Sequence, residues 1–272
     1  MTTAVPEGAR AAFGVAGEPE VLLGGMAPVY RFGGVVLKEI GDPVETAYLA
    51  DTMAAVEVDP AVVRVARPVA ALEGGWIAHG WSAWSVVEGA QPDGPQPWAA
   101  ALAASDALHD ALRGEQRAPF LDERTHRWAV AERVAWDEQE LAVEPRIEEQ
   151  TARLWPLVAR GREAPQLVHG DLCGNLLFHP TLPPAVIDFS PAWAPPSWAR
   201  AIYAVDALGW HHGDDDLLAL VRSDDETMAC LARAGIFRLV ALDGRVRDLG
   251  LDLAELLPEY QRLVDRLVTV LS

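Results

Sequence analysis

The pattern of apolar and polar positions in the first part of the chain is that of short strands. Between residues 19 and 40, apolar runs are interrupted by Gly24-Gly25 and Gly33-Gly34. Glycine adopts the positive φ of tight turns without strain, so this pattern predicts strands joined by hairpins. Asp42-Pro43 follows. Because Asp caps helix N-termini and Pro suits the first helical turn, we expect a helix over about residues 42–57.

Two further β-rich runs, at 62–71 and 76–87, complete the expected N-terminal lobe. They are separated by Glu73-Gly74-Gly75, another hairpin signal. Residues 1–88 are therefore expected to form a five-stranded, mostly antiparallel sheet with one helix. The segment 88–97 is rich in Gly and Pro and lacks apolar periodicity, so we expect the boundary between two lobes there.

Residues 89–272 have a different texture, with apolar residues at three- and four-residue intervals. This periodicity predicts a larger, mainly helical C-terminal lobe. The clearest amphipathic stretches lie near 98–113, 122–140 and 145–160. An extended patch at 166–178 and 183–190 interrupts them and predicts two short strands that bracket polar loops. The expected fold class is α+β and bilobal.

Composition narrows the class of protein. The chain has 272 residues, half of them apolar, and carries 40 acidic against 22 basic side chains, a formal charge of −18. Such a balance disfavours a nucleic-acid surface. The two cysteines, Cys173 and Cys230, form no disulfide framework or zinc pattern. The sequence also lacks a signal peptide and any unbroken run of eighteen apolar residues, so we expect a cytoplasmic protein without a membrane partner.

One lysine stands out against an otherwise all-arginine set of basic residues. Lys38 is the only lysine in the sequence, and it lies near the end of the third expected strand. One interpretation is that an Arg-rich sequence retained a single lysine by chance. The other is that the position needs a compact ammonium group.

The polar residues of the extended patch are the strongest chemical signal. His169, Gly170, Asp171 and Asn175 lie in its first loop, and Asp188 follows the apolar run Ala-Val-Ile in its second. Carboxylate and amide oxygens suit Mg²⁺, a hard cation that takes one or two carboxylates together with substrate phosphates. Alternatively, Asp171 and Asp188 are turn residues that bond backbone groups.

Together these residues form a recognisable set of motifs. HGDLCGN at 169–175 and IDFS at 187–190, preceded by VVLK at 35–38, resemble the aminoglycoside phosphotransferase and choline kinase-like family, distant relatives of protein kinases. The Arg- and Ala-rich composition suggests an actinobacterial branch. The resemblance implies a protein-kinase-like fold. It also implies an ATP-dependent kinase that moves the γ-phosphate to a hydroxyl of a small molecule, an aminoglycoside-like antibiotic or a metabolite.

The resemblance also assigns roles to individual residues. Asp171 would orient the acceptor hydroxyl or accept its proton, and Asn175 and Asp188 would coordinate Mg²⁺. Lys38 would contact the α- and β-phosphates. Glu45 would pair with Lys38 from the helix, although Asp42-Pro-Val-Glu45 also spells a capping box in which Glu45 returns to the helix start.

Two segments of the N-terminal lobe would contact the nucleotide. Gly24 and Gly25 stand where the family has a loop over the phosphates, and a plain hairpin turn is the alternative. Val87 and Glu88 match the family's hinge, whose backbone groups would bind the adenine edge. The implied cofactors are ATP, with GTP not excluded, and Mg²⁺, and we expect a monomer or weak dimer.

Three features depart from the family pattern. The loop from Asp171 to Asn175 is one residue shorter than usual, Ser190 replaces the glycine of the protein-kinase motif, and Met26-Ala27-Pro28 makes the covering loop sparse in polar side chains. A nucleotide-binding protein without turnover, acting as a regulator, is therefore the alternative function. Walker-type NTPases and Rossmann dehydrogenases are disfavoured, because GxxxxGK[ST] and GxGxxG are absent from the sequence.

Other residues have a structural and a functional interpretation. Trp193 and Trp198 could stack on an acceptor or simply pack the helical lobe. Asp206 resembles a buried Asp that braces the catalytic loop. The run 211–216 (HHGDDD) is better explained by a helix N-cap than by a metal site, and His109 is expected to be a core histidine.

Overall fold

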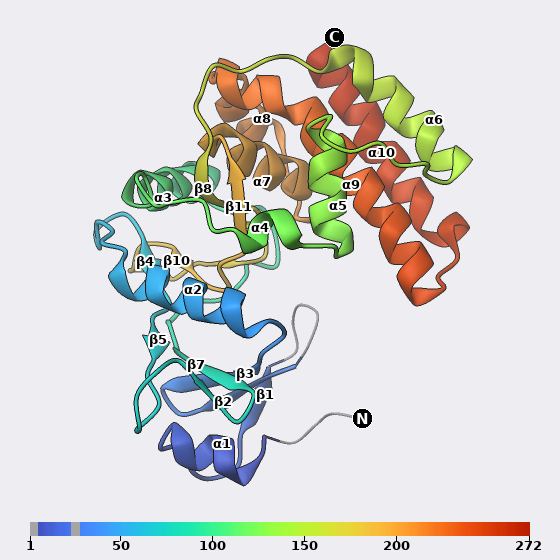
Figure 1. The fold of residues 1–272 in the computed structure, drawn as a ribbon. Coiled ribbons are helices and arrows are strands. Elements are labelled where there is room, and N and C mark those ends of the chain that lie inside the picture. Colours follow the sequence, from blue (N-terminus) through green and yellow to red (C-terminus); the bar gives the residue numbers. More distant parts are fainter. Residues whose placement is uncertain (1–4, 23–27) are drawn as a thin grey trace. The chain divides into compact units, whose positions relative to one another are not determined.

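The chain forms two compact units (Figure 1). The computed structural model describes residues 5–22 and 28–272. The first unit runs to Ala90 and includes the later segment Leu176–Phe189, and the second unit consists of Gln91–Asn175 and Ser190–Ser272. The α+β class is confirmed: antiparallel strands form in the N-terminal region, and a larger, mainly helical part follows along the chain.

An antiparallel sheet dominates the first unit. In the part of the chain that the structure describes, the sheet has six strands in the order β1-β2-β3-β7-β5, with β6 paired to β7. The expected number of five is wrong, because residues 76–87 form a hairpin of their own around His79-Gly80, both at positive φ. The strands are β1 Glu20–Leu22, β2 Val29–Phe32, β3 Val35–Glu39, β5 Pro68–Val69, β6 Ile77–Ala78 and β7 Trp81–Ser85.

The run 62–71 is divided between two sheets and is not one strand. Its first part, β4 (Arg64–Val65), pairs in parallel with β10 (Ala185–Val186), which also pairs with β9 (Leu176–Leu177). The Ala66 N–H donates to the Val186 carbonyl, whereas the next carbonyl, that of Arg67, accepts from Ser85 on the other sheet. The chain therefore changes its hydrogen-bonding partner between residues 66 and 67.

Side-chain alternation in β3 decides which way the lone lysine points. Leu37 is fully buried in a core that includes Tyr30 and Trp81 of the neighbouring strands. Successive strand residues face opposite sides of a sheet, so Lys38 lies on the face away from this core. Helix α1 (Glu7–Ala12) covers the core face and contributes Ala9.

The predicted helix after the third strand is confirmed as α2 (Pro43–Ala55). The Asp42 carboxylate accepts hydrogen bonds from the backbone N–H groups of Val44 and Glu45, at 2.7 and 3.2 Å. These bonds satisfy donors that have no partner inside the helix.

The second unit is built around one long helix, α9, which packs against α5, α6, α7 and α10 (Figure 1). A Cβ atom at Gly235 of α9 would lie 2.7 Å from side-chain atoms of both Leu154 and Leu267. Glycine at this position therefore lets α6 and α10 approach the backbone of α9 closely. The helices are α3 Trp98–Ala111, α4 Phe120–Glu123, α5 Arg127–Ala135, α6 Pro145–Leu154, α7 Pro196–Trp210, α8 Asp215–Arg222, α9 Asp225–Leu249 and α10 Leu253–Leu271.

Two predicted helices are shorter than their amphipathic patterns. The stretch 122–140 is divided into α4 and α5, because the His126 side chain caps a new helix by accepting from the Ala129 N–H. Asp137, in a left-handed conformation with φ of 60°, lies just past the end of α5. The stretch 145–160 ends as a 3₁₀ turn at Trp155–Leu157.

A two-stranded sheet positions the polar loop of the second unit. Strand β8 (Gln166–His169) pairs with β11 (Pro191–Ala194) in antiparallel register, with His169 opposite Pro191. His169 is completely buried at the end of β8, so the loop that follows starts from a fixed point. Across the described ranges, no helix has the length and apolar content that a bilayer crossing requires.

Candidate functional site

In the first unit, the lone lysine meets an acidic residue far away in sequence. The Lys38 Nζ atom lies 2.6 Å from Oδ1 of Asp188, and 150 positions separate the two residues. The structure therefore brings the strand lysine of the VVLK motif to the aspartate of the IDFS motif. The pair is held within one unit, because β3 and the segment that carries β10 belong to the same unit.

Asp188 adopts an unusual backbone conformation directly after the strand that carries it. Its φ is +51°, in the left-handed region that Asp tolerates better than most residues. The Asp188 side chain is 57% exposed and the Lys38 side chain 26%. A half-exposed pair of this kind contributes little to stability, on the order of 1 kcal/mol or less. Its position therefore points to a purpose other than holding the fold.

Of the backbone groups in the expected hinge, Val87 and Glu88, one already has a hydrogen-bond partner. The Glu88 carbonyl accepts a hydrogen bond from Arg64 at 2.7 Å. Within the described ranges, the backbone N–H and C=O of Val87 have no hydrogen-bond partner. Gly89 has a φ of +140°, and a Cβ there would lie 2.9 Å from Cβ of Leu177. Glycine at this position is thus needed for the segment to pass β9.

The remaining predictions for the first unit have different outcomes. Gly24 and Gly25 lie outside the described residues. Asp42 caps α2 as half of a capping box would, at the end of the helix where Glu45 lies. The pairing of Glu45 with Lys38 stays a prediction.

In the second unit, hydrogen bonds within the HGD loop fix its backbone. The Asp171 N–H donates to Nδ1 of His169 at 3.1 Å, and the Gly170 N–H donates to the Ser190 carbonyl at 2.8 Å. The Asn175 side-chain amide donates to the Asp171 carbonyl at 2.7 Å. The shortened loop is therefore closed by its own polar residues, and Asn175 remains at its end.

Asp171 is held from behind by an arginine of α9. Nη2 of Arg238 lies 2.9 Å from Oδ1 of Asp171, and the same guanidinium donates through Nε and Nη2 to both carboxylate oxygens of Asp206. The Asp171 side chain is 46% exposed, whereas those of Arg238 and Asp206 are 10% and 7% exposed. Asp171 thus presents a fixed carboxylate to solvent.

Burial and the neighbouring charge shift the pKa of Asp206 in opposite directions. Burial raises the pKa of Asp206 to about 6, and the adjacent Arg238 guanidinium lowers it from where burial alone would place it. The Asp206 carboxylate accepts charge-assisted hydrogen bonds on both oxygens, which favours its ionised form. The ionised Asp206 in turn keeps the Arg238 guanidinium charged, and the pKa of Arg238 lies above its ordinary value.

A buried histidine of α3 anchors the start of the loop. Nε2 of His109 accepts a hydrogen bond from the His169 N–H at 3.0 Å, and its Nδ1 lies 3.3 Å from Oγ of Ser105. Burial lowers the pKa of His109 to about 3, with the charges of His169 and Arg200 adding to the shift. His109 is therefore neutral near pH 7, with its proton on Nδ1. The expectation of a core histidine is confirmed.

The other predicted structural residues lie as expected. Trp198 is buried and packs edge-on against Phe237, with ring centroids 5.7 Å apart. Asp214 caps α8 by accepting from the Leu217 N–H at 3.0 Å. In the part of the chain that the structure describes, no group of three or more His, Cys, Asp or Glu side chains is placed to hold a metal. HHGDDD is thus a helix start.

The donor chemistry of Asp188 and Asn175 fits a hard divalent cation. Asp188 offers a partly exposed carboxylate, the type of ligand that Mg²⁺ prefers. The Asn175 amide nitrogen is turned toward the Asp171 carbonyl, and across the described residues its Oδ1 accepts no hydrogen bond. An oxygen ligand is therefore left over on Asn175.

Sequence reasoning missed Arg238 as part of this site. The residue lies in the run GIFRLVAL, where an arginine interrupts an otherwise apolar helix. A charged residue in such a run is rarely buried unless it is paired. That signal would have pointed to a buried acidic partner, which Asp206 provides.

The comparisons with known proteins agree with the motifs. A model of the phosphotransferase enzyme family matches residues 37–226, which is most of the chain. The chain belongs to the phosphotransferase enzyme family. A search of curated protein sequences found no match to this chain.

Solved structures of antibiotic kinases share the fold. An aminoglycoside phosphotransferase APH(4)-Ia, described in complex with ADP and hygromycin B, is 16% identical, with 98% of this chain and 99% of that chain covered and a TM-score of 0.61. The amicoumacin kinase hAmiN is 16% identical over 92% of this chain and 88% of its own, with a TM-score of 0.63. A spectinomycin phosphotransferase is 11% identical over 96% and 94%, with a TM-score of 0.52.

Proposed function

We propose that this protein is an ATP-dependent kinase that transfers the γ-phosphate to a hydroxyl group of a small molecule. Membership of the phosphotransferase family supports the reaction class. The observation that carries the proposal is the contact of Lys38 with Asp188, because a lysine and a carboxylate joined in this way are suited to bind nucleotide phosphates and their metal ion.

Each proposed residue has a distinct task. Asp171 orients the acceptor hydroxyl and accepts its proton, since its carboxylate is exposed and its loop is fixed. Lys38 contacts the α- and β-phosphates. Asp188 and Asn175 supply oxygen ligands for Mg²⁺, which when bound neutralises phosphate charge. The Val87 backbone supports binding of the adenine edge, and Glu45 and the glycines Gly24 and Gly25 retain the nucleotide-contacting roles that the resemblance implies.

Arg238 and the fixed carboxylate also bear on the second candidate, a nucleotide-binding regulator without turnover. A guanidinium 2.9 Å from Asp171 fixes the position of that carboxylate. A kinase of this type needs positioning more than strong basicity, because phosphoryl transfer relies on charge neutralisation and alignment. We therefore favour turnover.

The test is transfer of the γ-phosphate of Mg²⁺-ATP to a panel of hydroxylated metabolites and antibiotics, with Asp171→Asn as the control enzyme. We expect at least one acceptor to be phosphorylated by the wild-type chain and none by Asp171→Asn. Nucleotide binding without transfer to any acceptor, with equal slow ATP hydrolysis in both proteins, would favour the regulator.

A further inference from the structure

A cavity lies within the helical unit. Its volume is about 430 Å³, and its walls come from α4, α5, β11, the segment 159–165 and the N-terminal half of α9. Asp171, Asn175, Asp206 and Arg238 do not line it. The cavity is therefore separate from the residues to which the proposed phosphotransfer is assigned.

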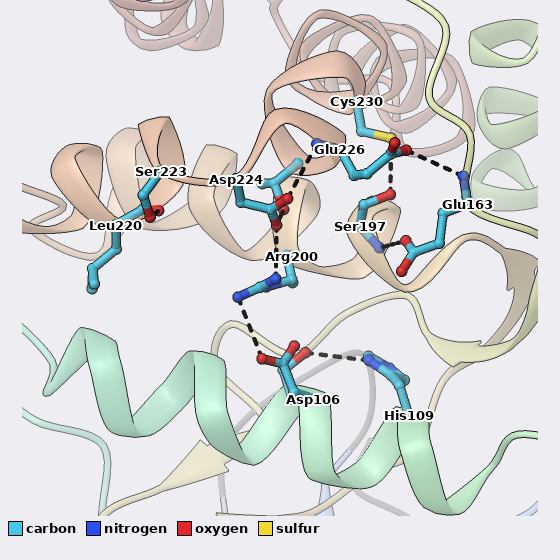
Figure 2. Close-up of polar contacts among 12 residues, drawn as sticks. Asp106, His109, Glu163, Ser197, Arg200, Leu220, Ser223, Asp224, Glu226 and Cys230 are labelled. Carbon is cyan, nitrogen blue, oxygen red and sulfur yellow. Dashed lines mark hydrogen bonds and ion pairs between the residues drawn. The ribbon is translucent and has the colours of Figure 1, made fainter.

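Part of the cavity wall is held rigidly by polar contacts. Glu163 accepts a hydrogen bond from the Ser197 N–H at 2.8 Å, and the Ser197 hydroxyl lies 3.5 Å from Sγ of Cys230 (Figure 2). The carboxylate of Glu226 accepts from the N–H groups of Arg162 and Glu163, which fixes the segment 159–165 against the start of α9. The cavity is thus a preformed feature of the unit.

The cavity contains a carboxylate that lacks a partner. Glu132 of α5 lines it, and in the described ranges its carboxylate makes no hydrogen bond and no ion pair. Burial raises the pKa of Glu132 to about 7. The charges of Arg124, Arg117 and Arg133 lower the pKa, and that of Glu138 raises it, yet burial outweighs them all. A partly buried acid without a hydrogen-bond partner is costly to keep ionised.

Most of the other charged side chains around the cavity already have partners. Arg233 donates to the Ala135 carbonyl and lies over the Trp136 ring, with 5.1 Å from its guanidinium carbon to the ring centroid. Arg117 is paired with Asp122, and Arg133 donates to Gln139 and to the Arg124 carbonyl.

The apolar part of the cavity wall comes from Ala129, Trp136, Trp193, Ala194 and Pro195. An aromatic and aliphatic lining of this kind suits a ring. Arg124 also lines the cavity, and it donates to the Pro191 carbonyl and lies over the Phe120 ring. Arg160 also lines the cavity, but its side chain is exposed and lies toward solvent. Among the partly buried charged groups of the lining, the one without a hydrogen bond or ion pair in the described ranges is therefore the Glu132 carboxylate.

We propose that this cavity binds a small organic cation, an amine attached to an apolar ring, with its ammonium group on the Glu132 carboxylate. The ammonium group supplies the hydrogen-bond donors that the carboxylate lacks, and the ring occupies the apolar part of the wall. The site takes its ligand independently of nucleotide.

The test uses benzylamine, titrated into the full chain without nucleotide by calorimetry and by ligand-observed NMR. We expect weak binding with a Kd in the millimolar range, and weaker or no binding of benzyl alcohol and benzoate. Glu132→Gln should weaken benzylamine binding at least fivefold. Glu138→Gln, which removes an exposed carboxylate at the same cavity, should change it less than twofold.

The pH dependence gives a second readout. Because the Glu132 pKa is about 7, benzylamine affinity should rise about tenfold from pH 6 to pH 8, while the amine itself stays protonated. Binding near pH 7 should release about half a proton, seen as a dependence of the heat on the buffer, and Glu132→Gln should abolish both effects. Thermal melting would verify that each variant is folded.

Three outcomes would overturn the proposal: equal benzylamine binding by wild type and Glu132→Gln, tighter binding of benzoate than of benzylamine, or no benzylamine binding at any soluble concentration. None of them bears on phosphate transfer, which involves neither Glu132 nor benzylamine.

Discussion

Two ion-pair systems, one in each unit, hold the residues of the candidate site in different ways. The Lys38–Asp188 pair of the first unit is partly exposed, with side chains 26% and 57% accessible. The Arg238–Asp206 pair of the second unit is almost fully buried, and its arginine extends to Asp171. Exposed pairs contribute little to stability, whereas breaking a buried pair leaves an uncompensated charge.

This difference in burial assigns the two pairs different tasks: the exposed pair binds ligand, and the buried pair holds Asp171 in position. Lys38 can leave Asp188 to bind phosphate, and Asp188 can leave Lys38 to bind metal. Either change costs little free energy, because solvent already reaches both side chains. Arg238 cannot leave Asp206 at comparable cost, so it serves as a fixed positioning residue for Asp171. Substitutions in the first pair should therefore change ligand binding, and substitutions in the second should change stability and turnover.

The largest effect is expected from the exposed member of the second system. Asp171→Asn should lower kcat for phosphate transfer by about 10³-fold, since a positioned general base contributes about 10²–10⁴-fold. Mg²⁺-ATP affinity should stay within twofold of wild type. Steady-state kinetics with the identified acceptor would measure the first, and calorimetry the second. A loss of less than tenfold in kcat would remove Asp171 from its proposed role.

Arg238→Met should destabilise the protein by about 3–5 kcal/mol, because it leaves the Asp206 carboxylate buried and unpaired. Urea or guanidinium unfolding would measure the loss. The double variant Arg238→Met/Asp206→Asn should recover part of the lost stability, since the stranded charge is then gone. A loss below 1 kcal/mol in the single variant would contradict the buried pair.

His109 should make the stability of the second unit sensitive to acid. Its pKa of about 3 in the folded protein lies below the ordinary value of 6.5, so the unfolded state binds the proton more tightly. Its contribution to stability is complete above pH 6.5 and is lost as pH falls toward 3, on the order of 1 kcal/mol per pH unit. Thermal or denaturant unfolding at pH 7 and pH 5 would show a smaller loss in His109→Gln than in wild type. An equal loss in both proteins would sink this assignment.

The smallest effect on stability is expected in the first pair. Lys38→Met should cost about 1 kcal/mol or less, because Asp188 is solvated without its partner. The same substitution should weaken Mg²⁺-ATP binding markedly. Unfolding curves would compare the stability of this variant with that of Arg238→Met. If Lys38→Met lowered the free energy of unfolding by about 3 kcal/mol or more, the two ion-pair systems would not differ as proposed.

The elements and motifs that depend on local pattern could be predicted from sequence. The lysine strand, the helix that Asp42 caps, and the loop after β8 follow from glycine turns, capping residues and apolar periodicity. The partners of β4 could not be predicted, since its pairing with β10 joins residues more than one hundred positions apart. The same holds for Arg238, whose place beside Asp171 depends on how α9 packs and not on any local motif.

The sharpest test compares Mg²⁺-ATP binding by calorimetry in wild type, Asp188→Asn and Asp171→Asn. We predict that Asp188→Asn weakens binding at least tenfold, because the neutral amide is a poor ligand for a hard cation, while Asp171→Asn binds as wild type does. Equal affinity in wild type and Asp188→Asn would contradict the assignment of nucleotide and metal to the Lys38–Asp188 pair.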